Sequence, residues 1–544
     1  MKLFPLITAV LCVIVSSLGA AESGKPNIIF ILADDLGIGN VSAYGADNYR
    51  TPNIDKLASE GMRFTHCYTA PLCGPSRALI MTGRYAFRTG ATNQDATGRM
   101  KPSVETMMPA YLKQAGYVTS CIGKWGQLPL GPGEFGFDDY LKFRGSGVYW
   151  NTKAKAEKYI VNGEEKILGD KEYMPELMHA HLVKFITKHR DEPFYIYYPM
   201  SHVHGELQRT PDSAPMPKDL MADNCAYMDK LVGKLVAELE RLNLREKTLL
   251  IFMGDNGTGN AWADKSTIGG RRLSGQKGSM LECGSLVPMI ANWPGKTPAG
   301  KVCEDFIDAT DFVPTLAELT GAKLPQGKVL DGHSILPQLR GEKGQPRVSI
   351  FMELARNWYV RESGWKLNEA GELFDMSGAP FTEKLVAASA DTDASKAART
   401  RLAATLAKLN PAGGVLDDGD GSGRHADKSK KANKKMDKQA PAKPEPKPES
   451  AAVLKTESQP VPNSAAVPSP SPLAPADATF AERAAKFDRI DKEHKGKLTR
   501  EEYTTRQSDP EAASKRFDKF DVNRDGFVTR EEYITNGAKK LKSQ

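Results

Sequence analysis

Four oxygen-bearing side chains follow closely on two apolar segments of the sequence. Asp34 and Asp35 come after NIIFILA at residues 27–33, and Asp255 and Asn256 come after TLLIFM at residues 248–253. Such short continuous apolar runs are typical of buried strands, and ligands of α/β sheets gather at the carboxyl ends of strands. Three carboxylates and an amide suit Ca²⁺ or Mg²⁺ better than zinc. We therefore predict a divalent-cation site, with solvated turn carboxylates as the alternative for either pair alone.

A third motif, LCGPSRALIMTGR at residues 72–84, lies between these two segments. Cys73, Pro75 and Arg77 resemble the C-x-P-x-R signature of type I sulfatases, and Thr82-Gly83-Arg84 fits its continuation. The resemblance implies that Cys73 is oxidised to formylglycine, with a formylglycine-generating enzyme as the partner during maturation. An ordinary buried cysteine before a helix with proline in its first turn is the alternative.

The resemblance extends from residue 25 to about residue 375. Further similar segments are GYVTSCIGKWG (116–126), YYPMSHVHGELQRTPDS (197–213), LLIFMGDNG (249–257), SGQKGSMLECGSLVPMI (274–290), TDFVPTLAELTG (310–321) and DGHSILPQLRG (331–341). The implied fold is alkaline-phosphatase-like. The implied catalytic residues are Cys73, Arg77, Lys124, His204 and Lys277, and the implied metal ligands are Asp34, Asp35, Cys73, Asp255 and Asn256.

The implied reaction explains why these residue types are needed. A sulfate ester is an anion with a poor leaving group, so the site needs positive charge, a nucleophile and an acid. Lys124, Lys277 and the cation supply the charge. One hydroxyl of hydrated formylglycine attacks sulfur, and the second later expels sulfate as the aldehyde re-forms. Arg77 holds the diol, and a histidine protonates the departing alcohol.

Two positions depart from the pattern of the family. The family usually has histidine after Lys-Trp, whereas Gly126 follows Lys124-Trp125 here, and Gln127 is a candidate substitute. The second departure concerns the acid, because two histidines, His202 and His204, lie in the matching segment. Alignment of the flanking residues favours His204, although Val203 stands where proline is common; His202 remains the alternative.

Short apolar runs alternate with amphipathic stretches up to about Pro411, which is the pattern of an α/β protein. We predict a large mixed sheet flanked by helices, with strands at 27–33, 194–198 and 248–253 and a helix at 223–242. Short runs between 348 and 374 predict antiparallel strands of a small subdomain. The predicted organisation is a signal peptide (1–21), a catalytic domain (22–345), its C-terminal subdomain (346–411), a disordered basic and proline-rich linker (412–476) and an α-helical module (477–544).

The last module contains an internal repeat, in which residues 487–503 match residues 517–533. The second copy predicts an EF-hand loop that binds Ca²⁺. Its ligands would be Asp521, Asn523, Asp525, the backbone carbonyl of Phe527 and Glu532, and Gly526 occupies the invariant turn position. Lys495 takes a ligand position of the first copy, so that loop is expected to bind Ca²⁺ weakly or not at all. For the second copy, a chance acidic turn is the alternative. We also expect that the module could dock on a partner.

The N-terminus predicts export to the periplasm or the outside of the cell. Lys2 precedes an apolar run that is too short to span a bilayer, and Gly19 and Ala21 suit a cleavage site. An uncleaved anchor is the alternative, and no later segment is apolar enough to cross a membrane.

Most of the net charge of +7 falls in residues 421–448. We interpret this charge as a solvated linker; the alternative is a surface that contacts nucleic acid, an anionic membrane or an acidic polysaccharide.

Together these patterns predict a sulfatase that cleaves sulfate esters on a small molecule or glycan. One alternative is a phosphodiesterase or phosphonate hydrolase built on the same site. Another is a catalytically inactive, calcium-dependent binding protein, which the departure at Gly126 keeps open.

Overall fold

The computed structural model describes residues 24–152 and 156–425, and in the C-terminal part residues 487, 490–491, 497–505, 514, 517, 520–521, 526–530 and 533. The predicted signal peptide and the predicted ligands Asn523, Asp525 and Glu532 lie outside the described residues. The chain divides into two compact units, Met1–Ala442 and Lys443–Gln544. None of the helices within the described part is both long and apolar enough to cross a bilayer.

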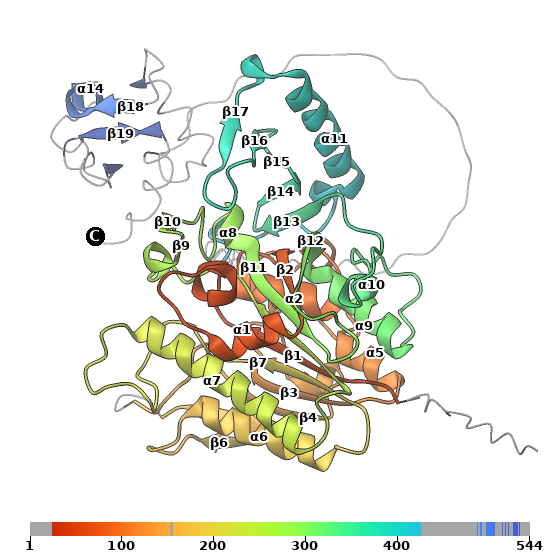
Figure 1. The fold of residues 1–544 in the computed structure, drawn as a ribbon. Coiled ribbons are helices and arrows are strands. Elements are labelled where there is room, and N and C mark those ends of the chain that lie inside the picture. The colour runs from red at the N-terminus through yellow and green to blue at the C-terminus, as the bar shows by residue number, and fades with distance from the viewer. Residues whose placement is uncertain are drawn as a thin grey trace, which may run out of the picture. The chain divides into compact units, whose positions relative to one another are not determined.

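A mixed ten-stranded sheet forms the centre of the first unit (Figure 1). Its strand order is β12-β2-β11-β8-β1-β7-β3-β4-β5-β6. The five strands β8, β1, β7, β3 and β4 are parallel, whereas β11 runs antiparallel to β8 and β2, and β5 and β6 complete an antiparallel edge. The strands are β1 Asn27–Ala33, β2 Met62–Tyr68, β3 Val118–Lys124, β4 Asp139–Phe143, β5 Lys158–Val161, β6 Glu164–Ile167, β7 Phe194–Pro199, β8 Thr248–Gly254, β11 Leu286–Asn292 and β12 Lys301–Asp308.

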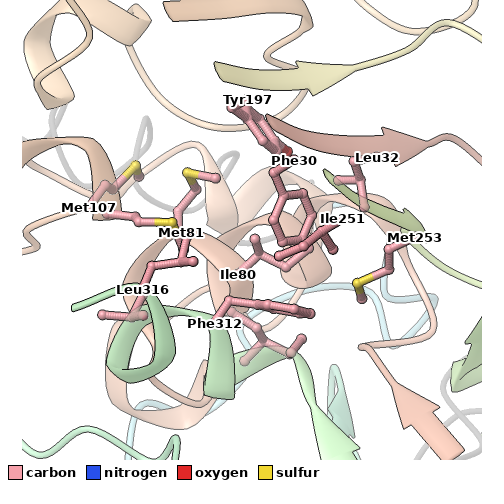
Figure 2. Packing of buried hydrophobic residues seen from close by; sticks show 14 of the residues in the cluster. Phe30, Leu32, Ile80, Met81, Met107, Tyr197, Ile251, Met253, Phe312 and Leu316 are labelled. Carbon is pink, nitrogen blue, oxygen red and sulfur yellow. The ribbon is translucent and has the colours of Figure 1, made fainter. Parts of the chain in front are cut away.

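Helices cover both faces of this sheet, because its central strands are buried at every position and successive side chains point to opposite faces. Phe30 of β1 faces one helical layer, and its ring meets the ring of Phe312 edge to face at 4.8 Å between centroids; Figure 2 shows this packing. Ile29 and Ile31 face the opposite layer. The first layer consists of α2 Cys73–Thr82, α5 Met108–Gln114 and α9 Phe312–Thr320, and the second of α1 Pro52–Ser59, α6 Met174–Lys188 and α7 Leu220–Arg241.

Several shorter elements complete the first unit. The short helices are α3 Ala86–Thr89, α4 Gln94–Thr97, α8 Glu282–Ser285 and α10 Leu336–Leu339, and a two-stranded hairpin consists of β9 Thr267–Ile268 and β10 Arg271–Arg272. The predicted strands at 27–33, 194–198 and 248–253 correspond to β1, β7 and β8, and the predicted helix at 223–242 to α7. The predicted large mixed α/β sheet is therefore confirmed.

The antiparallel C-terminal sheet predicted from short apolar runs is also present. Its five strands are β13 Ile350–Leu354, β14 Asn357–Glu362, β15 Trp365–Asn368, β16 Leu373–Asp375 and β17 Lys384–Val386. Helix α11, Asp393–Leu409, covers one face and is not among the predicted elements. On the other face a buried ion pair of 2.9 Å between Arg361 and Glu282 joins the sheet to the catalytic part.

Residues 411–425, which the sequence assigns largely to the linker, pack on the same unit. The N–H of Val415 donates to the carbonyl of Phe87 at 2.7 Å. The carboxylate of Asp417 is buried and accepts hydrogen bonds from Thr92 and Asn93. Because a buried carboxylate needs such partners, these contacts explain why the chain stays on the surface of the domain at this point.

A buried carboxyl of β13 gives the first testable prediction. Burial raises the pKa of Glu353 to about 8, although the N–H of Phe87 donates to this group at 2.9 Å. An unfolded glutamate has a pKa near 4.3, so this group contributes stability that is fully present at low pH and is lost as the pH rises towards 8. Glu353→Gln keeps the acceptor without the charge, and we expect it to remove this loss.

The measurement is the melting temperature of both proteins between about pH 5 and pH 9. The melting temperature of Glu353→Gln relative to wild type is expected to rise with pH. Glu362→Gln is the matched control, because Glu362 makes a surface ion pair with Arg401. Parallel curves for wild type and Glu353→Gln would contradict the protonated state assigned to Glu353.

The second unit brings the two copies of the sequence repeat together. Strand β18, Lys497–Thr499, pairs antiparallel with β19, Phe527–Thr529, and Leu498 stands opposite Val528, its counterpart in the repeat. Helix α14, Arg500–Thr505, follows β18. The N–H of Gly526 donates to a carboxylate oxygen of Asp521 at 3.1 Å. The buried core contains Phe487, Ile490, Leu498, Tyr503, Phe517, Val528 and Tyr533.

Candidate active site

Cys73 is the first residue of helix α2 and is buried. The free N–H groups of a helix N-terminus favour an anion at this end. The side-chain oxygen of Gln94 accepts from the N–H of Gly74 at 2.5 Å, and the left-handed Gly83 ends the helix after Thr82. The helix therefore holds Cys73 where negative charge is stabilised.

The thiol of Cys73 is a poor nucleophile in this environment. Burial raises its pKa to about 12, and although Lys124 acts in the opposite direction, it does not offset the desolvation. The reactive form of cysteine is the thiolate. An unmodified Cys73 would therefore stay protonated at neutral pH.

The predicted oxygen ligands converge beside Cys73. β1 and β8 pair in register up to Ala33 and Gly254, so Asp34 and Asp255 leave neighbouring strands side by side. Ligand atoms of Asp34, Asp35, Cys73 and Asp255 lie within 4.8 Å of one another. The amide N–H of Asn256 donates to Asp35 at 3.0 Å.

Three cations surround this acidic group. Arg77, one turn into α2, donates a hydrogen bond of 2.7 Å to Asp255. Lys124, the last residue of β3, donates a hydrogen bond of 2.6 Å to Asp34. Lys277 reaches Asp35 at 2.6 Å from the loop after β10. Three cations thus face three carboxylates, and all six charges are buried.

The surroundings shift the pKa values of the two strand-end carboxyls in opposite directions. Burial alone would raise the pKa of Asp34, but Lys124, His204 and Arg77 hold it below the ordinary value. Burial raises the pKa of Asp255, and the neighbouring charge of Asp34 raises it further. A cation bound between these groups would relieve that repulsion.

Two unpaired oxygens show that the residues fit a divalent cation. The Oδ1 atoms of Asp34 and Asn256 are buried and accept no hydrogen bond from any described residue. A buried oxygen without a partner is costly, and coordination to a hard cation would satisfy both atoms. Asp34, Asp35, Asp255 and Asn256, with the side chain at position 73, would hold the ion.

The structure distinguishes the two candidate histidines. The Nε2 atom of His204 lies 3.8 Å from Asp35, and its side chain is 22% exposed, so it stands where the buried site opens to solvent. His202 is fully buried and its Nε2 pairs with the hydroxyl of Tyr173 at 3.0 Å. Burial lowers the pKa of His202 to about 3. Of the two histidines, only His204 is both partly exposed and next to one of the clustered carboxylates.

The pKa of His204 lies below the ordinary value for histidine. Burial lowers its pKa, while Asp34 and Asp35 act in the opposite direction. An anionic substrate beside the ring would favour the imidazolium, because an opposite charge stabilises it.

Comparison with known proteins now decides the family. A sequence profile of the Sulfatase family matches residues 26–322, more than half of the chain. The chain belongs to the sulfatase family. It is 30% identical over 462 residues to Arylsulfatase D of Homo sapiens, covering 66% of this chain and 77% of the relative. It is 32% identical over 358 residues to the N-acetylgalactosamine-6-sulfatase of Canis lupus familiaris, covering 60% and 68%.

A solved structure supports the same assignment. The crystal structure of Ps i-CgsB in complex with k-i-k-neocarrahexaose superposes with a TM-score of 0.64 and 27% identity, covering 76% of this chain and 98% of that chain. The family hydrolyses sulfate esters, and it implies a metal ion and a formylglycine. The fold, the family and the sulfatase activity predicted from the sequence are therefore confirmed.

One position of this sulfatase differs from the expected pattern, and its backbone conformation favours glycine. Gly126 adopts a φ of +70°, which residues with a β-carbon rarely adopt. A β-carbon there would lie 3.3 Å from Cε of Lys124 and 3.7 Å from Cδ of Arg77. The backbone of this sulfatase is thus shaped for glycine. The next side chain, Gln127, has a buried Oε1 without a hydrogen-bond partner among the described residues.

Two residues of the site have no signal in the sequence. Gln94 is the first residue of α4, and only the fold shows that its side chain accepts a hydrogen bond from the N–H of Gly74. Tyr197 lies in β7, and its hydroxyl is 3.5 Å from Nη1 of Arg77. The period-2 pattern of the strand predicts on which face Tyr197 lies, but not its contact with Arg77.

Proposed function

We propose that this sulfatase hydrolyses carbohydrate sulfates with a formylglycine at position 73 as its nucleophile. The observation that supports this proposal is the position of Cys73 at the N-terminus of α2, where three buried cations and three carboxylates converge. Hydrated formylglycine would supply one hydroxyl that attacks sulfur and a second that later releases sulfate. The buried, protonated thiol of unmodified cysteine offers neither.

The remaining residues stabilise charge and position the reacting groups. Lys124 and Lys277 face the place where the sulfate oxygens gain charge, and buried donors are most effective there. Arg77 holds the hydroxyl groups at position 73, since its guanidinium is fixed by Asp255 and by the carbonyl of Lys124 at 2.9 Å. A Ca²⁺ or Mg²⁺ ion, when bound, would lower the pKa of the attacking hydroxyl and neutralise the sulfate.

His204 carries the proton that the alcohol needs. The attacking hydroxyl loses its proton to water, the bond between sulfur and its oxygen forms as the bond between sulfur and the ester oxygen breaks, and His204 gives its proton to the departing alcohol. The second hydroxyl at position 73 then returns a proton to His204, its oxygen forms the aldehyde, and the bond between carbon and the sulfated oxygen breaks, so that sulfate leaves. Water restores the diol, so one water is consumed for each ester.

Export, the oxidation of Cys73 and the role of the second unit are also part of the proposed function. We propose that residues 1–21 direct export to the periplasm or the medium and that a formylglycine-generating enzyme oxidises Cys73. The names of the relatives, which mention N-acetylgalactosamine and a neocarrahexaose, support a glycan substrate. Residues 477–544 would form an EF-hand pair that binds Ca²⁺ in its second loop and docks on a partner, supported by the pairing of β18 with β19.

His204 gives a prediction that depends on the leaving group. We expect His204→Ala to lower kcat/KM about 10²- to 10⁴-fold for an alkyl or sugar sulfate, whose alcohol needs a proton. The loss should be much smaller for 4-nitrophenyl sulfate, because nitrophenolate leaves without one. The measurement compares kcat/KM for both substrates.

His202→Asn is the control for this prediction. It removes the pairing with Tyr173, so we expect a lower melting temperature and equal losses on both substrates. Equal losses for His204→Ala on both substrates would contradict the role of His204 as the acid.

The test of the overall proposal compares substrate classes. Protein from the native host should hydrolyse an aryl sulfate more efficiently than an aryl phosphodiester, and peptide mass spectrometry should find an aldehyde at position 73. Preference for the diester would favour a phosphodiesterase. An unmodified Cys73 without turnover would favour a binding protein.

A further inference from the structure

Residues 414–425 pass beside the entrance of the site. We call this segment the C-terminal strap. The carbonyl of Gly423 accepts from the N–H of Gln94 at 2.9 Å, and Gln94 also accepts from Gly74, next to Cys73. Arg356 donates to the carbonyls of Asp417 and Gly419. The strap is therefore fixed both to the N-terminal end of α2 and to the C-terminal sheet.

These contacts bring Arg424 close to the catalytic groups. Its guanidinium lies 4.0 Å from the place that a β-carbon would take on Gly278, the residue after Lys277. The N–H of Gly278 donates to the carbonyl of Pro71 at 2.7 Å, two residues before Cys73. Gly278 is exposed and lacks a side chain, so nothing at this position separates Arg424 from the solvent-facing side of the site.

The charge of Arg424 has no ion-pair partner among the residues that the structure describes. Neighbouring ionic groups are paired, since His425 lies 4.0 Å from Asp95 and Asp418 lies 2.6 Å from Arg99. Across residues 24–152 and 156–425, by contrast, no carboxylate lies within ion-pairing distance of Arg424. Under the proposed function Lys124 and Lys277 would bind the sulfate that is removed, so the charge of Arg424 is left for a further anion.

We propose that Arg424 binds a second anionic group of the substrate, so that this sulfatase selects glycans that carry more than the sulfate it removes. The inference rests on the proposed function, since it names the substrate class of the same site. A second sulfate or a carboxylate on the same or the adjoining sugar has the required chemistry, because guanidinium binds both in a bidentate manner.

The test measures how short dextran sulfate inhibits the hydrolysis of 4-nitrophenyl sulfate. We expect Arg424→Ala to raise the inhibition constant about 10- to 100-fold, the range for removing a charged hydrogen-bond partner. Its effect on kcat/KM for 4-nitrophenyl sulfate, which has one anionic group, should be much smaller. Arg424→Lys should restore part of the inhibition.

Arg401→Ala is the matched control, because it removes the same charge from an exposed position on α11. Equal inhibition of wild type and Arg424→Ala, or a loss as large for Arg401→Ala, would overturn the inference. Binding of dextran sulfate to Cys73→Ala and to Cys73→Ala/Arg424→Ala by calorimetry keeps the inference testable without turnover. If wild type shows no turnover but the two variants still differ in their affinity for dextran sulfate, only the proposed function is overturned.

Discussion

Cys73→Ala should lower kcat/KM for 4-nitrophenyl sulfate by about 10⁴-fold or more, the scale found when an enzyme loses its covalent nucleophile. Alanine has no oxygen to attack sulfur, and the surrounding cations can only bind the ester. The side chain is small and buried at the start of α2, so the fold should persist. The measurements are initial rates and the circular-dichroism melting curve.

Cys121→Ala is the matched control for this substitution. Cys121 is also a buried free cysteine, in the middle of β3, and desolvation likewise raises the pKa of its thiol. We expect Cys121→Ala to lose stability and keep most of its activity. Comparable activity of Cys73→Ala and wild type would exclude position 73 as the nucleophile.

The central sheet follows from sequence because its strands are continuous apolar runs. NIIFILA is buried on both faces, so it carries a strong signal and its bounds are the same in β1. The strand ends then place Asp34 and Asp255 together, since β1 and β8 are neighbouring parallel strands. Chain order alone does not reveal this neighbourhood, because β8 follows β1 by more than 200 residues. The resemblance to a family supplies it.

The parts that the sequence does not predict depend on contacts between distant segments. Helix α11 consists largely of alanine and charged residues, so its weak amphipathic pattern gives little signal. The C-terminal strap has the composition of a linker, but Thr92 and Asn93 satisfy the buried carboxylate of Asp417. The different surroundings of His202 and His204 depend in the same way on a distant segment, because the hydroxyl of Tyr173 pairs with the buried ring of His202.

Removal of divalent cations with a chelator should lower the activity of the full chain by about 10³-fold, because a Lewis acid contributes several kcal/mol to such a transition state. The three carboxylates and Asn256, which follow β1 and β8, would lose the cation that they share. Added Ca²⁺ or Mg²⁺ should restore the activity. The metal that restores it at the lower concentration identifies the preferred ion.

Asn256→Ala separates this site from the second unit. It removes an unpaired buried oxygen, so we expect at least a tenfold higher metal concentration for half-maximal activity. The metal-dependent rise in melting temperature should fall as well, because binding to the folded state stabilises it. Asp521→Ala, in the proposed EF-hand loop, should leave the metal dependence of activity unchanged. If Asp521→Ala shifted that dependence and Asn256→Ala did not, the catalytic cation would have been assigned to the wrong unit.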